Sequence, residues 1–95
     1  MKVALLFYHS VYDDDIRDML HGLGCVRFIE VPHAWAQDQA DRRFGTHIHP
    51  GTDSIICAFV EGECTERLKE AVQKFRSGRA RENTHLALMP VEEFV

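Results

Sequence analysis

The stretch VALLFYHS at residues 3–10, followed by three aspartates at residues 13–15, decides how the chain begins to fold. Residues 3–8 are apolar at every position, which is typical of a strand that is covered on both faces of a sheet. The aspartates favour the positive end of a helix dipole. The apolar residues that follow at helical spacing are Ile16, Met19, Leu20 and Leu23. Gly24 stands where a left-handed residue ends a helix, so a strand and then a helix are predicted.

Three further strands and a second helix follow from the same kind of pattern. Residues 25–31 (CVRFIEV) and 54–60 (SIICAFV) are rich in β-branched and aromatic side chains, which favours strands. Pro32 ends the first of these or marks it as an edge strand. A second helix is predicted to open at residues 61–63 and to close at Ser77-Gly78, and residues 84–89 form the last predicted strand.

This order predicts an α+β fold of the ferredoxin-like type, β-α-β-β-α-β, in one domain over residues 1–95. Two helices then cover one face of a four-stranded antiparallel sheet, and residues 34–53 form a long excursion between two strands. The first and third strands are apolar on both sides. We therefore expect the second sheet face to pack against other subunits.

Composition excludes several classes of protein. Eleven basic against fifteen acidic residues give a net charge of −4, so no basic face for nucleic acid is expected. The longest apolar run, residues 3–8, is far shorter than the roughly 20 residues that span a bilayer, so no membrane insertion is expected. The three cysteines, Cys25, Cys57 and Cys64, have no C-x-x-C spacing. No disulfide framework is therefore expected, and the reducing cytoplasm is the predicted location.

Three stretches resemble the PII and PII-like signalling proteins. Residues 12–20 (YDDDIRDML) are similar to the acidic opening of that family's first helix, and residues 29–31 (IEV) to the T-E-V that leads into its T-loop. Residues 77–79 (SGR) stand where the family has T-G-K at the start of its phosphate-contacting B-loop. The resemblance spans nearly the whole chain and supports the predicted fold.

The chain also departs from this family's pattern. Arg81 and Asn83 replace the glycines that follow T-G-K, and the excursion contains no tyrosine that could accept the family's uridylyl group. The sequence stops at Val95, without the basic C-terminal loop that completes the family's ATP cleft. The resemblance is therefore to a divergent PII-like protein, not to an orthodox nitrogen sensor.

The resemblance implies a regulatory homotrimer with ligand clefts between its subunits. Its T-loop-like excursion would bind a membrane transporter or another regulated protein, and some PII-like relatives accompany metal-efflux systems. An adenine nucleotide (ATP, ADP or AMP) is one implied ligand, with Ser77, Gly78, Arg79 and Arg81 as its contacts. A glycine turn with arginines suits phosphate or carboxylate groups. The same residues are equally explained as a helix end whose basic side chains answer the dipole.

The histidines suggest a second ligand, a transition metal such as Cu, Zn or Ni. His47 and His49 are two residues apart, so in an extended segment both project from one face with Cα atoms about 6.5–7 Å apart. If the flanking strands continue outward as a hairpin, His33 falls opposite His49 as a third ligand, and Asp53 or another subunit completes the shell. The alternative is that these histidines are polar surface residues.

Catalysis finds little support, because no nucleophile-base arrangement occurs in a strand-turn context. The chain is therefore predicted not to be an enzyme. The alternative is a small ferredoxin-like isomerase or monooxygenase that is dimeric and uses His9 or Tyr8 in a cleft, by analogy of fold alone.

Overall fold

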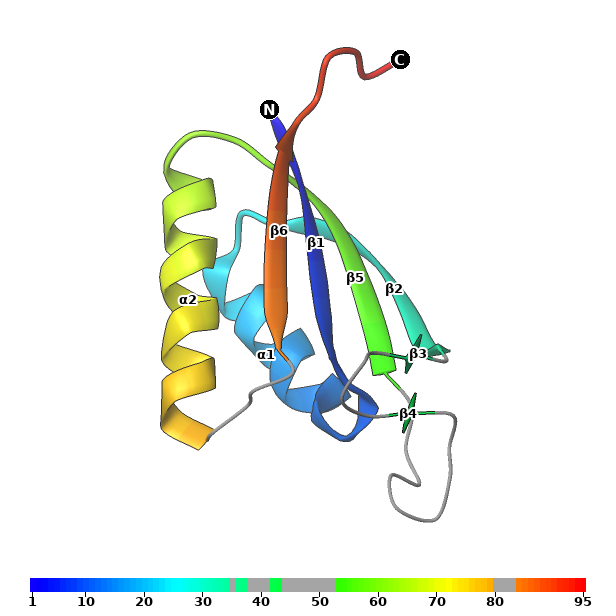
Figure 1. Cartoon of the computed structure of the whole chain (residues 1–95). Helices are drawn as coiled ribbons and strands as arrows, with labels where there is room; N and C mark the ends of the chain where they lie inside the picture. Colours follow the sequence, from blue (N-terminus) through cyan, green and yellow to red (C-terminus); the bar gives the residue numbers. More distant parts are fainter. Residues whose placement is uncertain (35, 38–41, 44–52, 80–83) are drawn as a thin grey trace.

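The computed structural model describes residues 1–34, 36–37, 42–43, 53–79 and 84–95 (Figure 1). The larger elements are β1 (Lys2–His9), α1 (Asp13–Leu23), β2 (Arg27–Ala34), β5 (Asp53–Val60), α2 (Glu63–Arg79) and β6 (His85–Pro90). The smaller elements are the 3-10 helix η1 (Ser10–Tyr12) and the short strands β3 (Ala36–Gln37) and β4 (Arg42–Arg43). No helix within the described ranges combines the length and apolar character needed to cross a bilayer.

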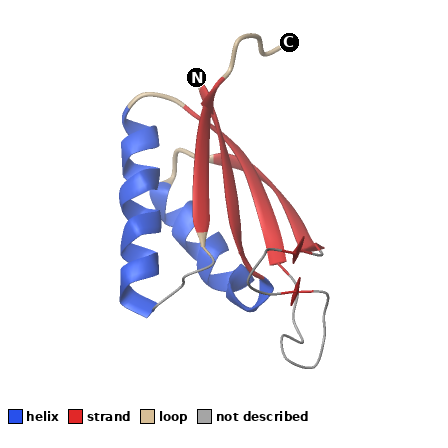
Figure 2. Cartoon of the chain, in the orientation of Figure 1, coloured by secondary structure: helices blue, strands red, loops and turns tan. Residues whose placement is uncertain are grey.

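The four long strands form one antiparallel sheet in the order β2-β5-β1-β6. Both helices lie on the same side of this sheet (Figure 2). The element order, the antiparallel pairing and the one-sided helix layer confirm the predicted ferredoxin-like α+β fold.

The core lies between the sheet and the two helices. Strand residues with even numbers point toward the helices, because side chains alternate between the faces of a sheet. The fully or nearly fully buried hydrophobic strand residues are Ala4, Leu6, Tyr8, Ile56, Ala58 and Val60. The helices bury Ile16 and Leu20 of α1 and Leu68 and Val72 of α2 against them. The apolar spacing seen in the sequence therefore marks the buried sides of both helices.

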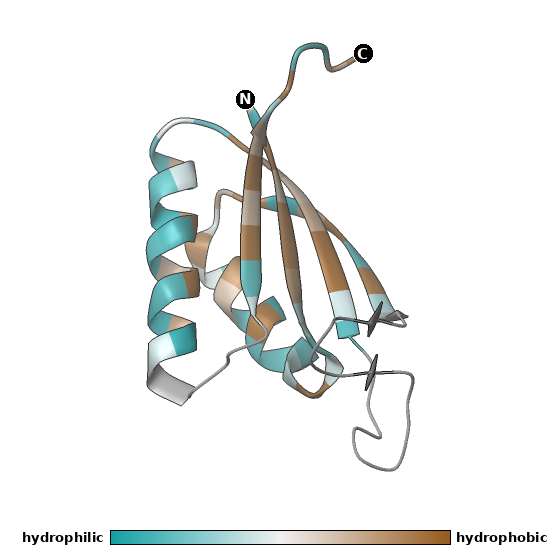
Figure 3. Cartoon of the chain, in the orientation of Figure 1, coloured by the Kyte–Doolittle hydropathy of each residue, from teal (hydrophilic) through white to brown (hydrophobic). Residues whose placement is uncertain are grey.

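The opposite face of the sheet, here called the open face, carries large apolar side chains with no helix over them. Ile29 is 63% exposed, Val31 48%, Met89 42% and Phe7 36%. The strands are correspondingly hydrophobic along much of their length (Figure 3). This is the face that the sequence predicts to be covered by other subunits.

Two glycines have the left-handed backbone that begins or ends a helix. Gly24 has φ 74° and its N–H donates to the carbonyl oxygen of His21 at 3.1 Å, which ends α1 as predicted. Gly62 has φ 53° and directly precedes α2. The predicted end of α2 at Ser77-Gly78 is too early, since the helix continues to Arg79 and both residues lie in its last turn.

The second strand also differs from its predicted bounds. β2 begins at Arg27, two residues later than expected, and continues through Pro32 to Ala34. Its pairing with β5 shifts register between Val31 and Ala34. β2 lies at the edge of the sheet, and an edge strand tolerates proline at an irregularity because no neighbour needs its missing N–H. Within the excursion, β3 and β4 pair with each other.

A disulfide joins Cys25 and Cys64, whose Cα atoms are 6.1 Å apart. The expectation of no disulfide was wrong, because it relied on local spacing, whereas these residues are 39 positions apart in the sequence. The fold brings them together: Cys25 follows the end of α1, and Cys64 lies in the first turn of α2. Cys57 is the free cysteine.

Removing this cross-link should destabilise the protein. Closing a loop of this length restricts the unfolded chain, and the loop-entropy relation gives about 4 kcal/mol at 25 °C. We expect Cys25→Ser/Cys64→Ser to lower the free energy of unfolding by that order in urea titrations at fixed protein concentration. Cys57→Ser is the control, and an equal loss in both variants contradicts a stabilising disulfide.

Candidate functional site

The ends of several strands and of helix α2 meet at one end of the fold, here called the excursion end. β1 ends there at His9, β2 ends at Ala34, β5 begins at Asp53, and α2 ends at Arg79 (Figure 1). The N- and C-termini lie at the other end. The described nucleotide contacts, at residues 77–79, and the base of the excursion therefore share one end of the molecule.

Buried polar side chains fill the core layer at this end. Tyr8 and Ser54 are both 0% exposed and sit opposite each other on β1 and β5. The Ser54 hydroxyl hydrogen-bonds the Ser10 hydroxyl at 2.9 Å, which ties the start of β5 to η1. The Tyr8 hydroxyl lies near the Asp13 carboxylate and Ser54, without a hydrogen bond of good geometry to either. The start of β5, where the excursion ends, is thus held from inside against the end of β1 and against η1.

This environment keeps the Tyr8 phenol neutral. Burial raises the pKa of Tyr8 well above its ordinary value of 10.0, and the negative charge of Asp13 raises it further. The Tyr8 phenol, one of the two residues considered for catalysis, is therefore buried in the core between the sheet and the helices. The Nδ1 atom of His9, the other residue considered for catalysis, accepts a hydrogen bond from the Val11 N–H at 3.2 Å and so caps η1.

An ion-pair network joins α1 to β2. The Arg17 Nε donates to Glu30 Oε1 at 2.9 Å, and an Arg17 terminal nitrogen donates to Asp14 Oδ1 at 2.7 Å. The hydrogen bond to Glu30 raises the pKa of Arg17 above its usual value. Glu30 is the middle residue of the stretch at 29–31 that resembles the T-loop approach. Its role here is to hold the strand that leads into the excursion against the first helix.

The predicted nucleotide contacts lie at the end of α2. Ser77 is exposed, and its hydroxyl donates to the backbone oxygen of Lys74 at 3.1 Å, as serine side chains within a helix do. Gly78 and Arg79 complete the helix, and Arg81 lies outside the described residues. Because residues 77–79 are helical, a phosphate-binding turn would begin after Arg79, three residues later than the predicted start at Ser77.

The predicted metal ligands are only partly within the described chain. His33 lies in β2, whereas His47 and His49 lie outside the described residues. The β2–β5 ladder pairs Ala34 with Asp53, so the base of the excursion brings His33 beside the start of β5. In the described ranges no three histidine, cysteine or acidic side chains gather as a metal site.

Sequence reasoning missed the Arg17–Glu30 pair and the Tyr8–Ser54 cluster. Both join residues of different elements, so their contacts depend on strand register and helix docking. For Tyr8 and Ser54 the available signal was the alternation of side chains in a strand, which places residues of equal parity on one face. Glu30 lies two residues after Phe28 in β2, and Phe28 packs against the core. This spacing puts Glu30 on the helix side of the sheet.

No family model matches the chain, and no curated protein sequence matches it. Solved structures do. A nitrogen regulatory PII-like protein, CPII from Thiomonas intermedia K12, bound to ADP, AMP and bicarbonate, superimposes with a TM-score of 0.71 at 17% identity. The match covers 97% of this chain and 88% of that protein.

Two CutA proteins share the fold more distantly. The PII-like protein CutA from Nostoc sp. PCC 7120 gives a TM-score of 0.61 at 18% identity, over 97% of this chain and 82% of that one. CutA1 from Pyrococcus horikoshii gives 0.52 at 10% identity, over 100% and 87%. The chain therefore has the fold of PII-like proteins, and the resemblance seen in the sequence is confirmed at the level of the fold.

The neutral Tyr8 phenol can be tested by alkaline titration. In the unfolded chain the phenol ionises near its ordinary pKa of 10.0, but in the folded protein it stays protonated to higher pH. Its stabilising contribution is therefore complete below pH 10 and is lost as the pH rises toward the folded pKa. We expect the difference in tyrosinate absorbance between wild type and Tyr8→Phe to appear only above pH 10. A difference centred at or below pH 10 in the folded protein contradicts the buried placement.

Proposed function

We propose that this protein is a PII-like regulatory protein, a homotrimer that binds an adenine nucleotide at clefts between its subunits. One observation carries this proposal: the fold matches over 97% of the chain a PII-like protein whose structure contains ADP and AMP. The regulated partner is a membrane transporter or another protein, contacted through residues 34–53. The chain acts as a single domain, residues 1–95, in the cytoplasm and without catalysis.

The open face supports the trimer. Its large apolar side chains alternate along the strands with residues that the helices bury. An exposed apolar sheet face of this kind is stabilised when other copies of the chain cover it. Each nucleotide cleft would then lie where the excursion end of one subunit meets its neighbour.

The end of α2 supports the nucleotide contacts, which are Ser77, Gly78, Arg79 and Arg81. Two arginines at or just beyond a helix end suit the phosphate groups of a nucleotide. This helix end lies at the same end of the fold as the excursion (Figure 1). Nucleotide binding there is therefore well situated to influence the segment that contacts the partner.

Arg79 provides the test of this site. Loss of one charge-assisted contact costs about 1.5–3 kcal/mol, which corresponds to roughly 10- to 150-fold weaker binding. Calorimetry with ATP, ADP and AMP should therefore show binding that Arg79→Ala weakens by this factor. Arg76→Ala, an exposed arginine one turn earlier on α2, is the control with the same change of charge.

Equal weakening in both variants would mean a general charge effect and would contradict a site at Arg79. If no adenine nucleotide binds the wild type, the end of α2 is an ordinary helix end.

A transition metal at His33, His47 and His49 is a second candidate ligand. The pairing of Ala34 with Asp53 supports it, because it brings the backbone of His33 close to Asp53, the residue expected to complete the shell. Copper should bind more tightly than zinc or nickel at such a nitrogen-rich site.

Imidazole coordinates only when neutral, so metal binding should strengthen as the pH rises from about 5.5 to 7.5, through the histidine pKa near 6.5. His47→Ala/His49→Ala should abolish Cu²⁺ binding measured by calorimetry. His21→Ala, an exposed histidine on α1, should leave it unchanged. Identical titrations of wild type and the double variant would rule out this metal site.

A further inference from the structure

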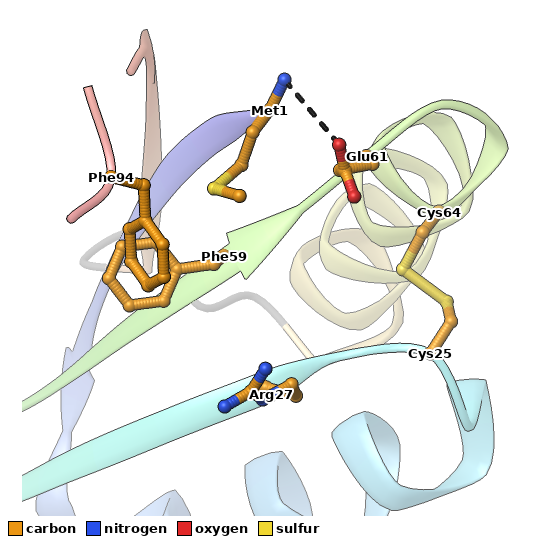
Figure 4. A pocket seen from close by; sticks show the side chains of 7 residues that line it. All are labelled: Met1, Cys25, Arg27, Phe59, Glu61, Cys64 and Phe94. Atoms are coloured by element: carbon orange, nitrogen blue, oxygen red, sulfur yellow. Dashed lines mark ion pairs between the residues drawn. A yellow bond between two sulfur atoms is a disulfide. The ribbon is translucent and has the colours of Figure 1, made fainter. Parts of the chain in front are cut away.

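The Cys25–Cys64 disulfide lies at the end of the fold opposite the excursion. Both cysteines line a pocket of about 250 Å³, together with Arg27, Phe59 and Glu61 (Figure 4). A pocket of this size accommodates a small molecule beside the disulfide. The two sulfur atoms are therefore adjacent to a space that a reagent can enter.

The two cysteines differ in exposure. Cys25 is exposed, whereas Cys64 is only 8% exposed. A thiolate that attacks a disulfide reaches the accessible sulfur and expels the other one. Here the expelled sulfur belongs to Cys64, in the first turn of the 17-residue helix α2. The positive end of the helix dipole stabilises a thiolate at that position.

Two arginines contribute positive charge near the exposed Cys25 and its pocket. A terminal nitrogen of Arg67 lies 3.8 Å from Cys25 Sγ, and the other donates to the Leu23 carbonyl oxygen at 2.9 Å, which fixes the guanidinium beside the sulfur. Arg27 lines the pocket from β2. The acidic residue of the pocket, Glu61, lies 3.9 Å from the N-terminal ammonium group of Met1. The local charge thus favours an anionic reagent.

We propose that the Cys25–Cys64 disulfide is a reversible site of thiol–disulfide exchange whose pocket accepts a small thiol bearing a carboxylate. The incoming thiolate attacks Cys25 Sγ, and the Cys25–Cys64 bond breaks with its electron pair going to Cys64. A second thiolate then attacks the small-molecule sulfur of this mixed disulfide and releases Cys25. Two small thiols are oxidised to one disulfide, and their two electrons and two protons convert the pair of cysteines to thiols.

The site of attack can be mapped directly on the folded protein. In a Cys57→Ser background, which removes the free thiol, oxidised protein is mixed briefly with mercaptopropionate, quenched with an alkylating agent and analysed by peptide mass spectrometry. The mixed disulfide should be on Cys25. An adduct on Cys64, or exchange only after unfolding in urea, overturns the proposal and leaves a purely structural cross-link.

The charge preference needs a matched pair of reagents. Mercaptopropionate is an anion and cysteamine a cation of similar size. With rates expressed per thiolate, we expect mercaptopropionate to react about 5-fold faster at low salt, and the preference to shrink in high salt. Arg27→Gln should reduce the preference to about 2-fold, whereas Arg76→Gln, on a distant turn of α2, should preserve it. Equal rates for the two reagents contradict the proposed ligand class. The proposed ligand class is also contradicted if a dithiol protein reduces the Cys25–Cys64 disulfide and neither small thiol does.

Arg67 is a positioning residue in this scheme, and a pH profile tests it. In reduced Cys57→Ser/Cys64→Ser protein, Arg67 should lower the pKa of the Cys25 thiol. Arg67→Gln should then move the pH midpoint of iodoacetamide reaction upward and slow the reaction at pH 7 about 3-fold, while Lys69→Gln should change neither. An unchanged midpoint in Arg67→Gln overturns this role. None of these readouts depends on nucleotide binding.

Discussion

The central constraint on this chain is that two helices cover only one face of a four-stranded sheet. β1 and β5 carry apolar side chains on both faces. The helices bury the side chains of one face and leave those of the open face exposed to water. Burial of apolar area is the main favourable contribution to folding and association. The fold of the single chain therefore already contains a reason to propose its assembly with other copies.

The topology of the sheet also gives its two ends different chemistry. At the excursion end, Tyr8 and Ser54 fill the core layer, and the Arg17–Glu30 pair fastens β2 to α1. At the opposite end, the disulfide fastens the turn after α1 to the start of α2. The base of the excursion is thus held by buried polar contacts. The Cys25–Cys64 disulfide lies at the opposite end of the fold. The proposed ligand site and the proposed site of thiol exchange therefore lie at opposite ends of the fold and can be tested separately.

The sequence predicted what depends on local periodicity and failed where contacts depend on topology. The end of α1 at Gly24 was predictable because only a residue tolerant of positive φ fits there. Of the two alternatives for Pro32, a strand end or an edge strand, the edge strand is the one found, and the irregular pairing that carries β2 on to Ala34 could not be read from one strand alone. The cysteine pair was missed because its partners meet only when both helix connections reach the same end of the sheet. At the predicted nucleotide site, the sequence placed the end of α2 to within two residues but missed that the helix continues to Arg79.

The most direct test of this account is the mass of the protein in solution, because the open face motivates the assembly and the clefts that depend on it. Light scattering at micromolar concentration should give about three times the 10.9 kDa mass of the chain. Ile29→Glu, on the open face, should yield monomer, whereas Val11→Glu, 69% exposed in η1 and away from the sheet, should remain trimeric. A wild-type mass of 10.9 kDa would contradict the account.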